Sequence, residues 1–212
     1  NSYAFSTGDS VYAVRDSNKV RGLFATRIYR SFGSISDGTS NTIAMSELLC
    51  SRPAPNGAQP GIATQARLYK HTAGYVLVPG LSQSPALCRA VTDGQYFIAG
   101  QTFWGRRGIN WTDGQPSYNG FATVLPPNGP GCADRGTWGD QNDIICPPAS
   151  QHTGGVNVAL ADGSVRFISN NIDTGNLAIG APAGQDIQGP SPYGVWGALG
   201  SIAGGETAQL PD

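Results

Sequence analysis

The clearest pattern of apolar and polar positions lies in HTGGVNVALADGSVRFIS, residues 152–169. Apolar residues at 156, 158 and 160 alternate with small or polar ones, and this period of two is typical of a strand with one buried face. Asp162-Gly163 follows and tolerates the positive φ of a two-residue hairpin turn. We therefore predict a hairpin in which Leu160 lies opposite Val165 and Val158 lies opposite Phe167.

Shorter patterns predict further elements. Strands are expected at 3–5, 10–14, 22–24 and 74–78. The segment TIAMSELLC (42–50) fits either a strand with Ile43 and Met45 on one face or a short helix, and we favour the strand.

The rest of the chain is less regular. Residues 80–150 mix Cys and Trp with Gly, Pro, Asn and Asp, and we expect a loop-rich insertion pinned by a disulfide, within a single domain of residues 1–212. The tail, 191–206, is expected to form an edge strand or a packed extended segment. The 30 Gly and 15 Pro favour turns, short strands and loops over helices, while 39% apolar residues are too many for a disordered chain.

The charge balance narrows the classes of partner to be expected. The 13 basic and 14 acidic residues give a net charge of −1 and form no basic stripe, so nucleic acid is not an expected partner. No stretch approaches the roughly 20 apolar residues of a membrane-spanning helix. A composition rich in Gly, Pro and Cys indicates an exported protein, and we expect that Asn1 is not its natural beginning.

The cysteines are Cys50, Cys88, Cys132 and Cys146. They form no CxxC pair and only two histidines accompany them, so a zinc site is not expected. We expect two disulfides formed in an oxidising compartment. Of the three pairings we favour Cys132–Cys146, which closes a short loop, together with Cys50–Cys88. Four buried thiols are the alternative.

Five blocks along the chain carry a family resemblance. They are RGLF (21–24), ISDGTSNTIAMSE (35–47), FATVLPPNGPGC (121–132), HTGGVNVALADGSVRFIS (152–169) and GVWGALGSIAGGE (194–206). In this order they resemble the DUF1559 family of planctomycete-type exported proteins, which have a prepilin-like N-terminal segment and an H-X9-DG motif near the C-terminus. The family has also been labelled as solute-binding, so the resemblance specifies the fold more closely than the function.

The resemblance implies a type IV pilin-like or pseudopilin-like head. Its fold class is α+β or mainly β, with an antiparallel sheet, long disulfide-pinned loops and little helix. In such proteins a hydrophobic N-terminal helix covers the sheet, and that helix is not among these residues. We therefore expect an apolar groove or patch on one sheet face.

The resemblance also implies a place and a set of partners. The expected location is extracellular, at the cell surface or in the periplasm. The expected partners are other copies of the chain or pilin-like subunits, with membrane contact only through the hydrophobic helix.

Ten residues of the matching blocks are expected to serve the family fold: Asp37, Gly38, Ser40, Asn41, Glu47, His152, Asp162, Gly163, Trp196 and Glu206. A histidine can act as a ligand or a proton carrier, but for His152 we favour a structural role in which its ring makes a hydrogen bond that orients the loop. Turn geometry alone explains Asp162-Gly163.

Calcium is the candidate cofactor. Asp37, Ser40, Asn41 and Glu47 offer oxygen ligands, but their spacing matches no EF-hand and suits an Asx turn. A second acidic loop contains Asp134, Asp140, Asn142 and Asp143. No other cofactor is expected.

Aromatic residues suggest a rival function. Trp104, Trp111 and Trp138 lie among Gly, Asn, Asp and Gln, and flat rings beside amides suit stacking on a glycan. The favoured alternative is that they pack the interior of a loop-rich domain.

The chain offers no candidate catalytic residue. It has no nucleophile elbow, dinucleotide fingerprint or phosphate loop, and no pair of acids stands out. We thus expect a non-enzymatic, exported pilin-like surface protein, a structural or adhesive subunit of a filament or envelope. The alternative is an extracellular protein that binds a glycan, such as a polysaccharide, or a solute through its Trp-bearing loops.

Overall fold

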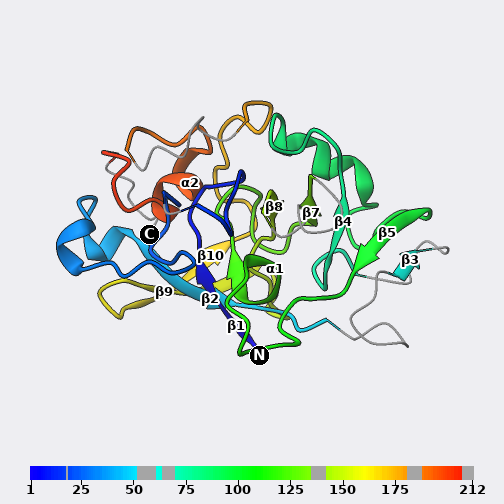
Figure 1. The fold of residues 1–212 in the computed structure, drawn as a ribbon, viewed down its shortest axis with the longest axis horizontal. Helices are drawn as coiled ribbons and strands as arrows, with labels where there is room; N and C mark the ends of the chain where they lie inside the picture. Colours follow the sequence, from blue (N-terminus) through cyan, green and yellow to red (C-terminus); the bar gives the residue numbers. More distant parts are fainter. Residues whose placement is uncertain (18, 52–60, 64–69, 135–141, 181–187, 207–212) are drawn as a thin grey trace.

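The computed structural model describes residues 1–17, 19–51, 61–63, 70–134, 142–180 and 188–206. It is a mixed α+β protein with two five-stranded sheets and short helices (Figure 1). This architecture is consistent with a pilin-like head, the fold class expected from the sequence. No helix within these ranges is long and apolar enough to cross a membrane.

The first sheet contains the N-terminal strand and the hairpin. Its strands are β1 (Tyr3–Ser6), β2 (Ile43–Glu47), β6 (Gly120–Phe121), β9 (Gly155–Leu160) and β10 (Val165–Ser169), in the order β10-β9-β2-β1-β6. Neighbours are antiparallel except β1 and β6, which run parallel. Helix α2 (Gly194–Gly200) belongs to the core on one face, where Trp196 and Leu199 pack with Val156, Val158 and Ile168.

The second sheet lies on the right in Figure 1. Its strands are β3 (Gly61–Ala63), β4 (Tyr75–Leu77), β5 (Gln101–Trp104), β7 (Gly131–Ala133) and β8 (Ile144–Ile145), in the order β3-β5-β4-β7-β8. The short helices are η1 (Phe32–Ser34), η2 (Thr39–Asn41), η3 (Pro85–Val91) and α1 (Pro116–Asn119). Residues 80–150, expected as a loop-rich insertion, supply three strands to this sheet and β6 to the first.

The predicted strands at 3–5 and 74–78 are present, but those at 10–14 and 22–24 are not. Gly22 N donates to Thr7 O at 3.1 Å and Phe24 N donates to Ser6 O at 3.0 Å. The segment therefore runs beside β1 without forming a regular ladder.

The hairpin is present, but its register differs by one residue from the prediction. Leu160 N donates to Ser164 O at 2.9 Å and Gly163 N donates to Leu160 O at 3.0 Å, so the loop holds three residues. Gly163, with a φ of 87°, provides the left-handed residue that such loops use. Val165 consequently pairs with Ala159 and Phe167 pairs with Asn157, and both apolar side chains turn away from the core.

The strand predicted within residues 42–50 is β2, but Ile43 and Met45 lie on opposite faces. Ile43 pairs with Leu160 and Met45 pairs with Ala159, so Ala44 is an extra residue in β2. A bulge of this kind reverses the alternation of side chains beyond it. Ile43 is therefore buried in the core while Met45 faces outward with Ala159.

The tail forms helix α2 rather than the predicted strand or extended segment. Three glycines lower its intrinsic helix propensity, but Trp196 and Leu199 are fully buried, and Trp196 Nε1 donates to Leu125 O at 2.9 Å. A Cβ at Gly200 would lie 1.8 Å from Thr123 Oγ1, so glycine permits this close packing. Tertiary burial here overrides local propensity.

The predicted cysteine pairing is wrong. Cys88 on η3 is bonded to Cys132 on β7, with 5.9 Å between their Cα atoms, while Cys50 is exposed and free and Cys146 is buried and free. Cys132 lies opposite Ile145 in the β7–β8 ladder, so Cys146, the next residue, faces the other side of the sheet. The alternation of β8 therefore separates the two cysteines that are close in sequence.

Candidate functional site

One face of the first sheet is apolar and exposed. Phe5, Met45, Ala159 and Val165 lie directly opposite one another across β1, β2, β9 and β10. The exposed fractions are 57% for Tyr3, 39% for Phe5, 63% for Val165 and 53% for Phe167. We call Tyr3, Phe5, Met45, Val165 and Phe167 the outer face. It is the apolar patch that the resemblance implies, and grouped exposed apolar side chains mark interaction sites.

Glu47 and His152 form a hydrogen-bonded pair beside the outer face, with Glu47 on β2 and His152 in the segment before β9. Glu47 pairs with Tyr3 in the β1–β2 ladder, and its Oε1 lies 3.0 Å from His152 Nε2. Asn157 N donates to the other carboxylate oxygen of Glu47 at 2.7 Å. The carboxylate of Glu47 thus orients His152, which is exposed, just before the hairpin.

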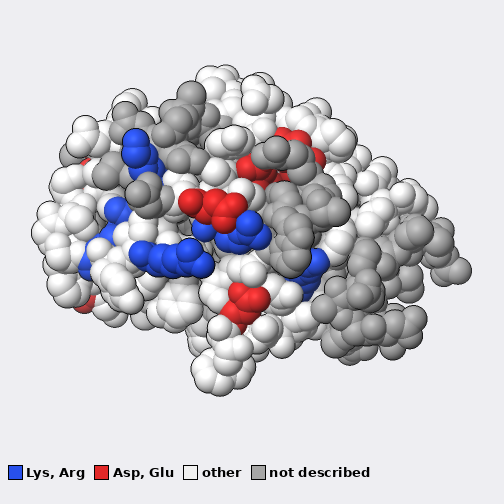
Figure 2. Space-filling view, in the orientation of Figure 1, with Lys and Arg blue, Asp and Glu red and all other residues white. Residues whose placement is uncertain are grey.

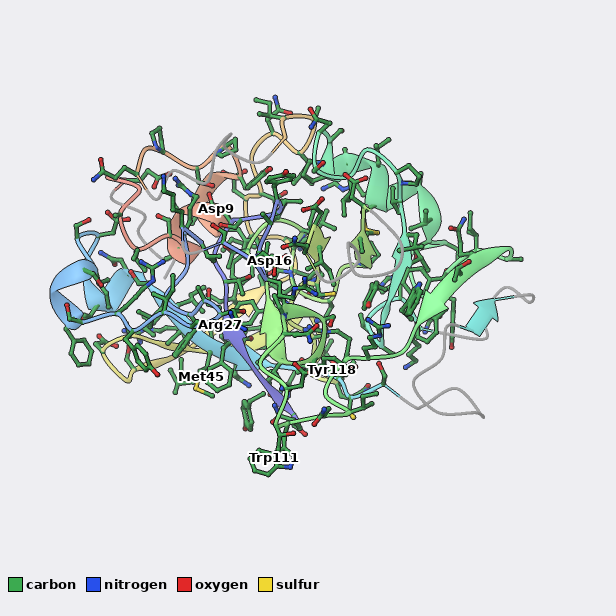
Figure 3. The ribbon with its side chains drawn as sticks, viewed as in Figure 1. Asp9, Asp16, Arg27, Met45, Trp111 and Tyr118 are labelled. Carbon is green, nitrogen blue, oxygen red and sulfur yellow. A yellow bond between two sulfur atoms is a disulfide. The ribbon has the colours of Figure 1, made fainter. Side chains whose placement is uncertain are left out.

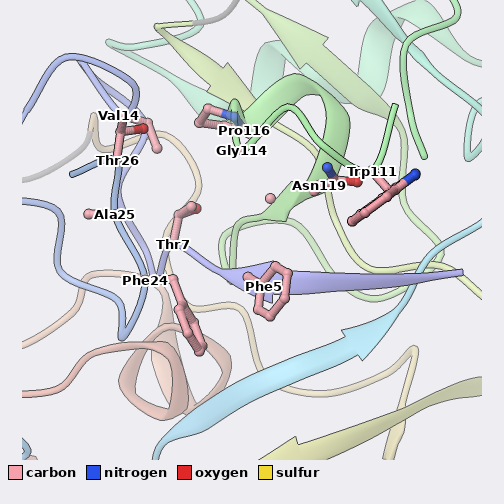
Figure 4. Close-up of a pocket in the computed structure, with 11 residues that line it drawn as sticks. Phe5, Thr7, Val14, Phe24, Ala25, Thr26, Trp111, Gly114, Pro116 and Asn119 are labelled. Carbon is pink, nitrogen blue, oxygen red and sulfur yellow. The ribbon is translucent and has the colours of Figure 1, made fainter. Parts of the chain in front are cut away.

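A pocket opens beside the outer face, between residues 24–26 and 111–120 (Figure 4). Its volume is about 270 Å³, and Phe5, Phe24 and Trp111 supply its aromatic side chains. The ring centroids of Phe5 and Phe24 lie 4.9 Å apart. Trp111 is 79% exposed and projects at the periphery of the molecule (Figure 3). We call this cavity the aromatic pocket, and its rings suit stacking on a flat apolar ring.

Neither Trp104 nor Trp196 lines the aromatic pocket with Trp111. Trp104 lies parallel to Tyr75, with 6.4 Å between ring centroids, and the Arg106 guanidinium lies 4.4 Å from the Trp104 ring centroid. Trp196 is in the core, and Trp138 lies outside the described residues. Trp111 instead lines the aromatic pocket with Phe5 and Phe24, neither of which was predicted as a site residue. The sequence feature that could have indicated Phe24 is its position in the RGLF block.

Asp37 connects the SDGTSN segment to the tail. Its Oδ2 accepts hydrogen bonds from Ser201 Oγ at 3.1 Å and Gly204 N at 2.6 Å, and its Oδ1 accepts one from Gly205 N at 3.0 Å. Asn41 Nδ2 donates to Asp37 O at 3.2 Å. The carboxylate therefore faces hydrogen-bond donors, as expected for a residue that holds two segments together.

Turn geometry accounts for the other small residues of the motifs. Gly38 and Gly163 have φ values of 95° and 87°, in the left-handed region. Asp162 Oδ1 accepts hydrogen bonds from Ser164 N at 2.9 Å and Ser164 Oγ at 2.7 Å, and these bonds lower the pKa of Asp162. Ser40 is exposed on η2.

A buried ion pair was not anticipated from the sequence. Arg21 Nε donates to Asp9 Oδ1 at 2.7 Å, and both side chains are almost completely buried. The Arg21 guanidinium also donates to Gln188 O at 2.9 Å and Gly189 O at 2.7 Å. The only sequence signal for this pair was an arginine at the start of the otherwise apolar RGLF block.

Glu206 lies half-buried near this pair. Ser191 N donates to its Oε1. Burial raises the pKa of Glu206, the nearby carboxylates of Asp9 and Asp37 raise it further, and the Ser191 hydrogen bond and Arg21 lower it. Glu206, the last residue of the fifth family block, thus lies near Arg21, the first residue of the first block.

The expected calcium ligands do not converge in the described residues. Asp134 accepts hydrogen bonds from Gly80 N and Ser82 N, both at 2.8 Å, whereas Asp143 accepts one from Ala13 N at 2.8 Å. Asp140 lies outside the described residues. In the part of the chain that the structure describes, no group of three or more His, Cys, Asp or Glu is placed to hold a metal ion.

Comparison with known proteins identifies the family. A family model described as a protein of unknown function (DUF1559) matches residues 1–175 of the 212. No curated protein and no solved structure matches the chain. The matched range includes all strands of both sheets, the outer face and the residues of the aromatic pocket. Since the match covers well over half of its length, the chain belongs to the DUF1559 family.

Proposed function

We propose that this protein is a non-enzymatic, exported pilin-like surface protein, a structural or adhesive subunit of a filament or of the cell envelope. The observation that carries the proposal is the outer face, where Tyr3, Phe5, Val165 and Phe167 are exposed on strands whose opposite face is packed. Its partners are other copies of the chain or pilin-like subunits.

Burial of the outer face supplies the driving force for assembly. A helix placed on a sheet buries the apolar side chains of both elements. Covering the exposed parts of Val165 and Phe167 contributes up to about 1.5–3 kcal/mol per side chain. The occupant in a pilin-like arrangement is a hydrophobic helix, which links the head to its filament.

The proposed location is extracellular, at the cell surface or in the periplasm. The Cys88–Cys132 disulfide supports it, because disulfides persist in oxidising compartments. The non-enzymatic role is supported by the motif residues, since the carboxylates of Asp37 and Asp162 bind nearby donors that shape the fold.

Immunogold electron microscopy of intact producing cells tests the proposal, with an antibody against residues 1–212. We expect label in lines along thin fibres. The double variant Val165→Glu with Phe167→Glu should lose the fibres while the head still folds. The matched control, Leu87→Glu with Ile98→Glu, alters two other exposed apolar side chains and should keep them. Label scattered over the envelope without fibres would overturn the filament role.

A second candidate function is capture of an extracellular glycan or solute. The aromatic pocket favours it, because Trp111 is exposed beside Phe5 and Phe24. Titration with a glycan panel, followed by tryptophan fluorescence, should give saturable quenching that Trp111→Ala abolishes. Unchanged fluorescence across the panel would rule this function out and leave the subunit role.

A further inference from the structure

A charged pocket adjoins the aromatic pocket. Its volume is about 460 Å³, and its lining includes Arg15, Asp16, Arg27 and Gln115. Thr26 lines both cavities, and Gln115 is followed by Pro116 of the aromatic pocket. The two cavities are therefore adjacent compartments of one groove, of the size that small-molecule sites have, roughly 300–1,000 Å³.

The charges of this compartment favour an anion. Arg15 and Asp16 form a bidentate pair, with Nε–Oδ1 and Nη2–Oδ2 distances of 2.8 and 3.0 Å, and Asn142 Nδ2 also donates to Asp16 Oδ2 at 2.8 Å. Arg27 is exposed and its guanidinium makes no hydrogen bond to the residues that the structure describes. Among the described lining residues, two arginines and one aspartate leave a net positive charge, and the charge of Arg27 also helps to lower the pKa of Asp16. Figure 2 shows basic side chains gathered in the middle of this face beside acidic ones.

The backbone of Arg27 is unusual. Its φ of 62° lies in the left-handed region, which is costly for a residue with a side chain. Residues held in such conformations cluster at ligand-binding and active sites. The strained position presents the Arg27 side chain at the charged pocket, next to Thr26, where the aromatic pocket begins.

We propose that this groove binds an acidic oligosaccharide, a chain of sugar rings that carry carboxylates. The inference rests on the second function proposed above and names its ligand class. One ring stacks in the aromatic pocket against Trp111, and the carboxylate of a neighbouring ring pairs with Arg27. Thr26 and Gln115 offer hydrogen-bonding groups between these two positions. An oligomer matches the groove because its successive units place a ring in one compartment and a charge in the other.

Isothermal titration calorimetry with the whole chain tests this inference. The probes are trimers of galacturonate and of mannuronate, each compared with its methyl ester, which keeps the rings and removes the charge. We expect an acid trimer to bind about tenfold more tightly than its ester, as befits a hydrogen bond to a charged group. Raising the salt concentration should weaken the acid form selectively.

Two variants test the roles of the two compartments separately, and a third variant is the control. Arg27→Asn removes the charge, and Asn tolerates the left-handed backbone, so acid and ester should bind alike. Trp111→Ala should weaken both forms about tenfold or more. The control Arg89→Gln removes an exposed arginine on η3 and should change neither.

The outcomes separate the inference from the function on which it rests. Equal affinity for acid and ester in the wild-type protein would overturn the acidic class and still support glycan binding. No binding of either form by protein that circular dichroism shows to be folded would overturn both. The filament proposal is tested separately on cells and is unaffected by this result.

Discussion

Arg21 Nε lies 2.7 Å from Asp9 Oδ1, and the two side chains are 1% and 0% exposed. The pair joins the RGLF block to the segment that follows β1, and Arg21 also binds the backbone of residues 188 and 189. Removing one partner of such a pair leaves a buried charge without compensation, which costs more than the pair itself contributes.

Asp9→Ala and Arg21→Met should therefore each lower the free energy of unfolding by about 3–5 kcal/mol. Urea denaturation followed by circular dichroism measures this loss. The control Asp16→Asn weakens the partly exposed Arg15–Asp16 pair and should cost less than about 1 kcal/mol. Equal, small effects at all three positions would contradict the role of the buried pair.

The cysteines should differ in reactivity. Cys50 is exposed and should react with iodoacetamide in the native protein, whereas burial raises the pKa of Cys146 and hides its sulfur. Peptide mapping by mass spectrometry should find native label on Cys50 alone and label on Cys146 only in denaturant. Cys88 and Cys132 should label only after reduction, which should also cost about 2–4 kcal/mol of stability. A Cys132–Cys146 bridge in the peptide map would refute this pairing.

Stability should fall in mild acid because of His71. Its ring contacts Thr92 Oγ1 at 2.7 Å and Asn128 O at 2.9 Å, and burial lowers its pKa below the ordinary 6.5. The unfolded chain then binds more protons than the folded protein, so stability declines as pH drops below about 6.5. Denaturation midpoints between pH 7.5 and 5.5 measure the slope.

His71→Gln should flatten this slope, because the buried group no longer titrates. The matched control His152→Gln changes the other histidine, which is exposed, and should retain the contribution of His71. Identical slopes in the wild type and in His71→Gln would refute the assignment.

Gly200→Ala should destabilise the protein, although alanine is the better helix former by about 1 kcal/mol. The added Cβ would lie 1.8 Å from Thr123 Oγ1, so Thr123 or the helix must shift, at a cost of about 1–3 kcal/mol. Thermal unfolding measures the change. Gly114→Ala is the control, since no atom lies within 4 Å of its Cβ and the change should stay within about 0.5 kcal/mol. A stabilised Gly200→Ala would show that the helix can move.

Several features could be predicted because they depend on neighbouring residues. The alternation of apolar residues in β9 and the Asp162-Gly163 turn predicted the hairpin, in which Gly163 is left-handed. A period of two also predicted the strand β2. The blocks that suggested the DUF1559 family lie largely within the matched residues. The candidate site was predicted only in part: the apolar sheet face was expected, and Trp111 was named only in the less favoured glycan-stacking interpretation. Phe5, Phe24 and Arg27 were not named as site residues.

The errors came from single residues with distant consequences. One extra residue in the hairpin loop turned Phe167 outward, and one bulged residue in β2 separated Ile43 from Met45. The tail forms a helix because Trp196 bonds to Leu125 O and Gly200 packs closely against Thr123. Neither contact can be recognised from the sequence of the tail alone.

The sequence by itself determined β1, β2, β4, the β9–β10 hairpin with its turn at Asp162-Gly163, and the family, since alternation, turn residues and motif blocks can be read over short stretches. Only the tertiary structure decided that Cys88 joins Cys132 and that Phe5, Phe24 and Trp111 line one pocket. These contacts join residues far apart in the chain, and their geometry depends on strand register and on how the sheets and their connecting segments pack, which no local pattern encodes.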